Sequence, residues 1–471
     1  MFKSQDIEKS KGVSNQSEPS LISRTVAHSK IYLTQQYEEY PYRWINFVIF
    51  LLACLVQAIS MHAFTPVANQ IKNIYNIQSS SVTLPALLFM VVSPPAMIIA
   101  NFITDKFGTT VGGLLLIIGT GLKCLVNKGF IFVYIGSCVN GAANNLILNS
   151  PSKVASNWFK PVNSGLIGVF FTLAILTSTT WGVFIPPFFI NQTSNETSVF
   201  NLLFFEFILT SSAMILMIVL LKESPPTPPS QVSKEEKASF LPQIKILFSN
   251  KNYILIFLVM GLLLGGYSGF ISVIAFYFKP YDIDSNSTSL MILGCTIGGA
   301  FSSIIVGFYI KKTKKLKFTA IIGLLGSLSM FALIQLTLNI IPNFALLCVA
   351  FTITGCTVFP VIPCLLELGS EVSYPVSQPI ATGFLFCSQQ IFGFIIGFLS
   401  SYILEISEIW AYIYFQAIFI FAFVLMIMVK EEFLRTKQNL CSTINIEGDI
   451  DAIEEIDIQD ITEQLSVQGI L

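Results

Sequence analysis

The sequence predicts an all-α membrane protein whose twelve transmembrane helices form two six-helix bundles. Three observations lead to this fold class. Only 11% of the 471 residues are charged, whereas a soluble domain of average composition has roughly 25% charged residues. Mean hydropathy is +0.72, so the chain carries more apolar surface than a water-facing fold can bury. Twelve apolar runs also reach or approach the ~20 residues that a helix needs to cross a bilayer.

The twelve apolar runs follow one another in two groups of six. The first group covers residues 44–66, 82–104, 109–126, 130–150, 163–189 and 198–221, and the second covers 253–278, 287–310, 317–338, 341–364, 377–403 and 408–429. Prolines interrupt the second run at Pro94 and Pro95 and the tenth at Pro360 and Pro363. We expect kinks there, because proline removes a helical hydrogen bond and frees a carbonyl group.

Polar segments outside the runs divide the chain into five parts. Four prolines between Pro225 and Pro229 exclude a continuous helix through the longest interior polar stretch. The C-terminal segment 445–463 is acidic, and we expect it to be disordered or weakly helical. The predicted parts are a cytoplasmic N-terminal tail (1–42), a six-helix bundle (43–221), a cytoplasmic linker (222–252), a second six-helix bundle (253–430) and an acidic cytoplasmic tail (431–471).

Lysine placement predicts which side of the membrane each connection faces. With the N-terminal tail inside, thirteen lysines fall in cytoplasmic connections, and only Lys72, Lys123, Lys128 and Lys279 fall on the opposite side. Short loops rich in basic residues favour the cytoplasmic side. We therefore expect both termini and the linker to be cytoplasmic.

Polar side chains inside the apolar runs are the candidate substrate-binding groups, because a polar group in hydrocarbon usually faces a cavity or a partner helix. Each has a structural alternative. His62 would be a neutral histidine bonded to a neighbouring helix, the asparagines would link helices, and Tyr267 would pack. The candidates are Gln57 and His62 in the first run, Asn140 and Asn144 in the fourth, Tyr267 and Ser268 in the seventh, and Gln389 and Gln390 in the eleventh.

Several function classes find no support in the sequence. It has no phosphate-binding Gly-Lys-Ser/Thr loop, no HExxH motif and only two histidines, so we expect no enzyme, metal site or cofactor. The net charge of −1 gives no indication of a nucleic-acid partner. We also expect no carboxylate inside the membrane in the first half. That expectation favours recognition by aromatic and neutral hydrogen-bonding groups and weakens the case for proton coupling.

The connection after the second run resembles the signature loop of the major facilitator superfamily. Asp105, Lys106 and Gly108 match that loop, whereas Asn101 replaces its first glycine and threonines at 109–110 replace its arginines. The resemblance implies two bundles that rock about a site near the bilayer midplane. It also implies a gating role for the three matching residues, the alternative being a solvated turn.

Three further charged residues are gating candidates. Glu367 and Glu371 follow the tenth run, and Lys153 follows the fourth. We expect the two glutamates to pair across the halves with Lys153 or with the lysines of 311–317, as part of an inner gate. The alternative is a solvated loop.

A closer resemblance rests on motifs spread over residues 40–430. They are YPYRW at 40–44, SPSKVASNWF at 150–159, the proline pair at 186–187, ELGSEVSYP at 367–375 and SQQIFG at 388–393. Together they resemble the feline leukaemia virus subgroup C receptor family, solute carrier family 49. The resemblance implies a carrier, with choline, ethanolamine, pyridoxine or haem as the family's substrates.

The resemblance carries over to the binding residues at one position of four. The family's choline-binding members enclose the quaternary ammonium group with aromatic residues, whose faces attract cations. Met61 stands at the aromatic position of the first run and Ser268 at that of the seventh, with Tyr267 beside it. Leu176 replaces a glutamine, whereas Gln390 retains one. Met61 and Ser268 are therefore included among the candidate substrate-binding residues.

The sequence thus predicts a monomeric, multi-pass carrier in the plasma membrane or an organelle membrane. It would move a small organic solute by alternating access, with membrane lipid as its surroundings. A choline- or ethanolamine-like solute leads, and pyridoxine or haem follows. The alternative function is a non-transporting receptor or regulator that retains the transporter fold.

Overall fold

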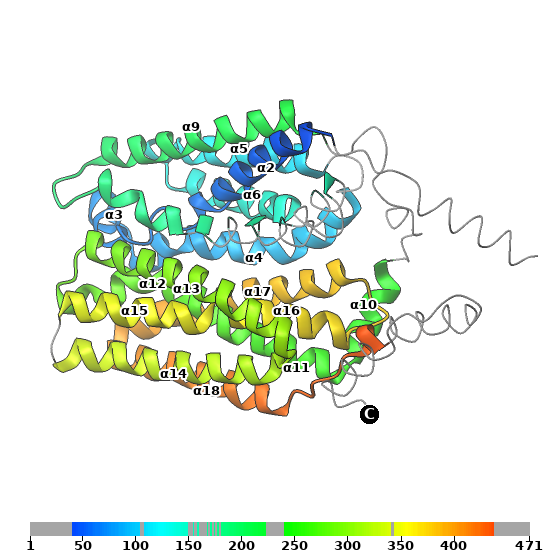
Figure 1. The fold of residues 1–471 in the computed structure, drawn as a ribbon. Coiled ribbons are helices and arrows are strands. Elements are labelled where there is room, and N and C mark those ends of the chain that lie inside the picture. The colour runs from blue at the N-terminus through cyan, green and yellow to red at the C-terminus, as the bar shows by residue number, and fades with distance from the viewer. Residues whose placement is uncertain are drawn as a thin grey trace, which may run out of the picture.

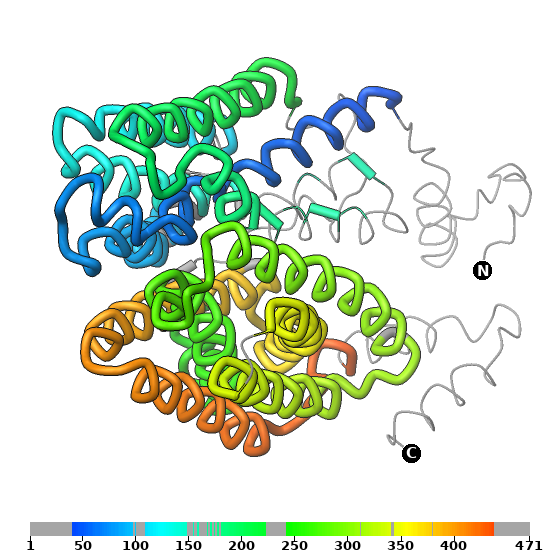
Figure 2. Tube along the Cα trace, turned by 90° about the vertical axis from the view of Figure 1, so that its left-hand side faces the viewer, coloured from blue at the N-terminus to red at the C-terminus, as the bar shows by residue number. Residues whose placement is uncertain are grey.

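The computed structural model describes residues 40–103, 108–148, 180–222, 240–340 and 343–437, together with nine single positions between 154 and 178. All secondary structure in these residues is helical. We call described residues 40–222 the N-terminal half and 240–437 the C-terminal half. In both views the halves lie side by side with their helices running in roughly the same direction (Figure 1, Figure 2).

The N-terminal half is built around α5, which packs against α6 on one side and α9 on the other. Helix α4 covers α6, and α2 lies along α9. The elements of this half are α2 (Tyr42–Val56), η1 (Ile59–Met61), α3 (Ala68–Tyr75), α4 (Ser79–Ile103), α5 (Gly108–Lys123), η2 (Val126–Lys128), α6 (Ile131–Leu148), η3 (Pro186–Phe188) and α9 (Glu196–Leu220).

The C-terminal half repeats this plan, with α15 packed between α13 and α14 and with α12 along α17. Its elements are α10 (Phe240–Ser249), α11 (Lys251–Met260), the π-helical turn η5 (Gly261–Gly265), α12 (Gly266–Phe278), η6 (Lys279–Tyr281), α13 (Ser285–Thr313), α14 (Leu316–Ile340), α15 (Phe344–Val358), α16 (Val361–Val372), α17 (Gln378–Ile406) and α18 (Glu408–Met428). Helix α10 lies inside the predicted linker, after the four prolines between Pro225 and Pro229, and carries Pro242 in its first turn.

Eleven of the twelve predicted runs coincide with helices of the described residues, and the fifth run (163–189) is only partly described. Within this part of the chain, nine helices are long and apolar enough to cross a membrane. Two shorter apolar helices, Thr109–Lys123 and Ile131–Ile147, cover the third and fourth runs. The prediction of a multi-pass, all-α membrane protein is confirmed.

One pair of hydrogen bonds occurs in each half and shows the repeat between them. In the N-terminal half, Asn46 Nδ2 donates to Lys222 O at 3.0 Å, and Lys222 N donates back to Asn46 Oδ1 at 3.2 Å. In the C-terminal half, Asn252 Nδ2 donates to Lys430 O at 2.6 Å, and Lys430 N donates back to Asn252 Oδ1 at 2.8 Å. Each asparagine thus joins the first long apolar helix of its half, which starts at α2 or α11, to the second residue beyond the last such helix, α9 or α18.

The halves meet mainly where α4 packs along α17 and where α12 contacts α3 and α4. Five hydrogen bonds between the halves lie toward one end of the helices, which we call the α3 end. They join Asn69 to Ala275, Gln70 to Ser285, Thr83 to Ser401, Thr180 to Thr296 and Ser289 to Val183. The opposite, α10 end lies near α10 and the segment after α18 (Figure 1).

Candidate functional site

A cavity of about 100 Å³ lies between the two halves. We call it the central cavity. Both halves contribute side chains to it, and none of the described residues that line it is Asp, Glu, Lys or Arg. Its lining is Gln57, Ala58, Met61, His62, Phe89, Asn144, Thr180 and Val183 from the N-terminal half, and Leu264, Tyr267, Ser268, Ile271, Ile292, Phe359, Ile362, Phe386, Gln389 and Gln390 from the C-terminal half.

A break in the first transmembrane helix supplies four of the lining residues. The sequence predicts one helix over 44–66, but α2 ends at Val56 and α3 begins at Ala68. Pro66 accounts for the later part of the break, because proline donates no hydrogen bond and disfavours helix in the residue before it. Irregular backbone at membrane depth is tolerated where it is buried or lines a cavity. Here it presents Met61 and His62 to the cavity, both less than a tenth exposed.

Polar side chains satisfy the backbone groups that this break leaves without helical partners. Ala58 N donates to Ser178 Oγ at 2.8 Å. Lys123 Nζ donates to the carbonyl oxygen of Ser60 at 2.6 Å, and Asn140 Nδ2 donates to Ser60 Oγ at 2.8 Å. The break is therefore held in one shape by α5, α6 and a residue of the fifth run.

The seventh helix also departs from regular geometry beside the cavity. The π-helical turn η5 inserts one wide turn between α11 and α12, a feature often found at functional sites. Tyr267 and Ser268 follow it directly and line the cavity. Gly265 permits α17 to approach closely, because a Cβ atom at this position would lie 2.7 Å from Gly393 N. Gln389 Nε2 of α17 lies 3.4 Å from Ser268 Oγ.

The tenth helix is interrupted at Pro360, where a kink is expected from the sequence. Helix α15 ends at Val358 and α16 begins at Val361. Phe359 stands between them and meets Tyr267 edge to face, with ring centroids 5.7 Å apart. Phe89 of α4 and Phe386 of α17 also line the cavity. Aromatic rings therefore surround the polar groups, and ring faces attract cations.

Three amide oxygens of the lining have no hydrogen-bond partner among the described residues: Gln57 Oε1, Asn144 Oδ1 and Gln390 Oε1. Gln57 and Asn144 are 2% and 4% exposed, so bulk water does not satisfy these oxygens. His62 Nδ1 lies 3.1 Å from Thr65 Oγ1, and no described residue bonds its Nε2. The cavity thus presents neutral acceptors that a solute with several N–H or O–H donors would satisfy.

Eight of the nine predicted substrate-binding residues line this cavity: Gln57, Met61, His62, Asn144, Tyr267, Ser268, Gln389 and Gln390. Asn140 does not. Its side chain is fully buried against Ser60 and against Gly119, where a Cβ atom would lie 2.0 Å from Asn140 Oδ1. The lining residues absent from our prediction are chiefly apolar or aromatic, and nothing distinguishes them in the sequence from the other apolar residues of their helices.

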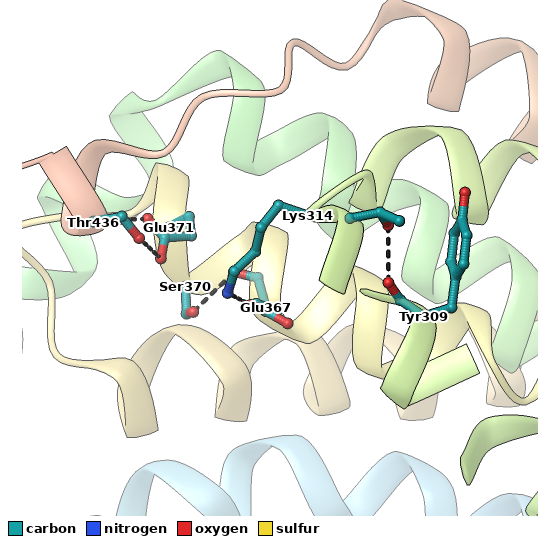
Figure 3. A network of polar contacts seen from close by, with 7 residues as sticks. Tyr309, Lys314, Glu367, Ser370, Glu371 and Thr436 are labelled. Carbon is teal, nitrogen blue, oxygen red and sulfur yellow. Dashed lines mark hydrogen bonds and ion pairs between the residues drawn. The ribbon is translucent and has the colours of Figure 1, made fainter. Parts of the chain in front are cut away.

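The gating candidates that the structure describes pair within the C-terminal half and not across the halves (Figure 3). Lys314 Nζ lies 3.8 Å from Glu367 Oε1. Lys314 ends α13 and Glu367 lies on α16, and these two helices belong to the same half. Asp105, Lys106 and Lys153 lie outside the described residues, and Gly108 begins α5.

The segment after α18 is fastened to the α10 end of the C-terminal half. Glu371 accepts hydrogen bonds from Thr436 N at 3.0 Å and from Thr436 Oγ1 at 2.8 Å (Figure 3). Arg435 donates to the carbonyl oxygen of Val376 at 2.8 Å. Burial lowers the pKa of the Arg435 guanidinium, while the neighbouring Glu371 raises it. Glu371 therefore anchors a terminal segment in this conformation.

The expectation that the first half has no membrane-embedded carboxylate is wrong. Glu206 lies on α9, within a span that meets the membrane criteria, and is 1% exposed. Lys123, counted above among the loop lysines, is also 1% exposed and faces the first helix. A lone Glu inside the apolar run 198–221 was the available sequence signal.

Comparison with known proteins adds to this geometry. The family model described as Major Facilitator Superfamily matches residues 49–397. The choline/ethanolamine transporter FLVCR1 of Felis catus is 24% identical over 375 residues, which cover 74% of this chain and 66% of that protein. The matched stretch is thus just under two thirds of that relative's length. The solute carrier family 49 member 4 homolog of Xenopus laevis is 22% identical over 395 residues, covering 78% of this chain and 86% of that protein.

Solved structures show the same fold. A bacterial homolog of the human lysosomal transporter Spinster, in an inward-facing and unoccupied conformation, matches with a TM-score of 0.62. The match covers 83% of this chain and 96% of that chain at 14% sequence identity. At that identity the likeness concerns the arrangement of helices alone.

Proposed function

The chain belongs to the major facilitator superfamily, and we propose that it is a carrier for a small organic solute. Its similarity to members of solute carrier family 49 confirms the resemblance seen in its motifs. It would work by alternating access and perform no covalent chemistry. The segments 43–221 and 253–430 would act as the two rocking bodies. The central cavity would be the binding site.

The observation that carries this proposal is a set of three amide oxygens that have no partner among the described residues. They lie in a cavity whose described lining is uncharged and partly aromatic. A buried acceptor without a partner is costly, so each oxygen favours a ligand that donates to it. A primary ammonium group offers three N–H donors, and a hydroxyl group offers one more. An ethanolamine-like solute carries both groups, whereas the quaternary ammonium of choline would contact only the aromatic walls.

The size of the cavity supports a small solute. One water molecule needs about 10–15 Å³ of such space, so about 100 Å³ holds a compact molecule of several heavy atoms. A rigid macrocycle such as haem would require the halves to separate. The name of the feline relative, a choline/ethanolamine transporter, supports the same class of solute. Pyridoxine, with three hydroxyl groups, is the next candidate.

The contacts between the halves support alternating access. Thr180 and Val183 line the cavity and also bond across the halves, to Thr296 at 2.6 Å and Ser289 at 2.8 Å. These bonds close the route from the cavity toward the α3 end. Solute would leave through that end only after these bonds break, while contacts form at the α10 end.

Uptake into proteoliposomes that contain the purified full chain tests the proposal. We expect labelled ethanolamine to enter faster than into protein-free vesicles, and unlabelled ethanolamine to compete better than choline, pyridoxine or haem. Folded protein that moves none of the four would contradict the carrier function. A receptor that retains the fold would then be the better description.

A further inference from the structure

Glu206 is a membrane-embedded carboxyl group that the proposed binding site does not use. It lies on α9, which packs against α5, and is 1% exposed. Its Oε1 atom is buried and has no partner, and the structure records no hydrogen bond or close ion pair for Glu206 among the described residues. Burial of an ionised carboxylate without a hydrogen-bond partner is costly, and these surroundings favour the protonated form.

Lys123 is the basic residue that interacts electrostatically with this carboxyl group. The lysine ammonium, however, is bonded elsewhere. It donates to Ser60 O at 2.6 Å and lies 5.8 Å from the centre of the Phe64 ring. The ammonium is thus held by the break of the first helix, which carries Met61 and His62 into the central cavity.

Among the described residues, the other titratable groups near α9 leave Glu206 with this single cationic neighbour. Cys124, next to Lys123, also interacts with the carboxyl electrostatically, and its Sγ lies 3.5 Å from Leu203 O. The elements packed against α9 carry six more titratable groups. Three of them donate hydrogen bonds elsewhere: Tyr42 to Leu220 O, Lys72 to Ser79 and Tyr75 to Asn127. Arg43 lies beside the Trp44 ring, Cys54 is a buried thiol, and Lys128 is exposed.

A small polar cavity gives water a place beside the lysine. It measures about 10 Å³, close to the space that one water molecule occupies. Ser60, Thr65 and Lys123 line it from the N-terminal half, and Ser272 lines it from α12. The cavity therefore reaches from the lysine to the interface between the halves, where solvent access changes during alternating access.

We propose that Glu206 is a proton-binding site coupled through Lys123 to the break of the first helix, so that the carrier moves a proton together with its solute. With the proton bound, Lys123 stays on Ser60 O and the break keeps the shape that lines the cavity. When the proton leaves to water, the carboxylate attracts the ammonium away from Ser60 and the break loosens. Protonation therefore favours solute binding, and solute binding favours protonation by the same factor. The co-transport in this proposal rests on the proposed carrier function.

Solute-driven proton movement tests the coupling. Proteoliposomes with a clamped membrane potential and a pH dye inside receive ethanolamine without a pH gradient, and protein-free vesicles provide the baseline. We expect the lumen to acidify with the wild-type chain. With Glu206→Gln, acidification per molecule of ethanolamine taken up should fall to the baseline. Glu405→Gln, at the exposed end of α17, should acidify the lumen as the wild type does. Equal acidification by Glu206→Gln and the wild type would overturn the proposal.

Infrared difference spectroscopy on the purified protein tests the proton site without any solute. A pH step should change the carbonyl band of a protonated carboxyl group in the wild type and in Glu405→Gln, and that change should be absent in Glu206→Gln. In Lys123→Met the band should persist to higher pH, because the neighbouring positive charge is gone. A wild-type spectrum without a band that depends on Glu206 contradicts the site. Absence of transport with the band present would instead contradict the carrier function.

Discussion

A buried amide oxygen without a partner costs about 1–3 kcal/mol, and three residues of the central cavity carry an amide oxygen that no described residue bonds. A carrier gains from this arrangement, because the solute supplies the missing donors. Gln390 is also the one position of four at which this chain retains the binding residue of the family's choline-binding members. Its oxygen is therefore the most direct place to measure what one acceptor contributes.

Replacing Gln390 with alanine should weaken the apparent affinity for an ethanolamine-like solute by roughly 10- to 100-fold. A hydrogen bond to a charged group contributes about 1.5–3 kcal/mol, and 1.4 kcal/mol is tenfold in affinity. Competition uptake in proteoliposomes measures the change. Gln416→Ala is the matched control, because that glutamine lies on α18 outside the cavity lining and bonds Leu328 O at 3.3 Å. Equal loss in both variants would remove Gln390 from the site.

Residue types alone identified most of the polar site, but not which asparagine faces it. Asn140 and Asn144 lie four residues apart, on one face of α6, so periodicity assigns them the same role. The structure separates them, because Ser60 of the broken helix meets Asn140 and leaves Asn144 to the cavity. Lys123 was misplaced because a charge near the end of an apolar run is as consistent with a loop as with a buried partner. Glu206 lies well inside the run 198–221, and the sequence analysis overlooked it.

Among the elements, the first, seventh and tenth helices depart from regular geometry at the level of the cavity. The first helix is broken between Val56 and Ala68, the seventh has a wide turn from Gly261 to Gly265, and the tenth is interrupted at Pro360. Regular helices bond their backbone groups internally. Breaks and wide turns leave backbone polar groups available for other partners and change the direction in which nearby side chains point. The site is built from these departures.

Replacing Gly265 with alanine should lower the unfolding free energy by about 1–3 kcal/mol, the usual cost of overpacking. The added Cβ atom would lie 2.7 Å from Gly393 N and 2.8 Å from Phe392 Cβ, so α17 would have to move. Thermal unfolding in detergent measures the loss. Gly307→Ala is the control, because no atom lies within 4 Å of a Cβ there. That variant should be neutral or slightly more stable, and destabilisation of both to the same degree would contradict this packing.

The sequence predicted the helices well and their interruptions unevenly. Run length and hydropathy locate a span without reference to its partners, and eleven of the twelve runs contain described helices. Prolines inside a run indicated the break at Pro360. The first run was predicted to end at residue 66, although the eight helical residues of α3 follow soon after. The π-helical turn leaves no proline and so no comparable signal.

Across the whole molecule, the two halves repeat each other and pack together along α4 and α17, and five hydrogen bonds between them lie toward the α3 end. The reciprocal bonds of Asn46 with Lys222 and of Asn252 with Lys430 mark equivalent corners of the two halves. The bonds between halves at the α3 end involve residues 106 to 318 positions apart in sequence. Hydropathy and charge placement predict two halves, but no local pattern predicts which end is closed, because that depends on contacts between distant residues.

Closing the α3 end permanently should stop transport. The hydroxyl oxygens of Thr180 and Thr296 lie 2.6 Å apart, so cysteines at both positions would be near the ~3.5–4.5 Å Cβ separation of a disulfide. We expect oxidised Thr180→Cys/Thr296→Cys protein to be inactive and reductant to restore uptake. Each single variant should tolerate the oxidant. If the cross-linked double variant took up ethanolamine as fast as the wild type, transport would not require the α3 end to open.

Counterflow in proteoliposomes is the most direct test of a carrier that alternates between two openings. Vesicles loaded with excess unlabelled ethanolamine should accumulate labelled ethanolamine transiently above its external concentration. Each binding site that releases an unlabelled molecule outside is then free to carry a labelled molecule inward. Vesicles without internal ethanolamine should only equilibrate. A receptor gives neither result. Binding of labelled ethanolamine without any overshoot, by folded protein, would contradict the account.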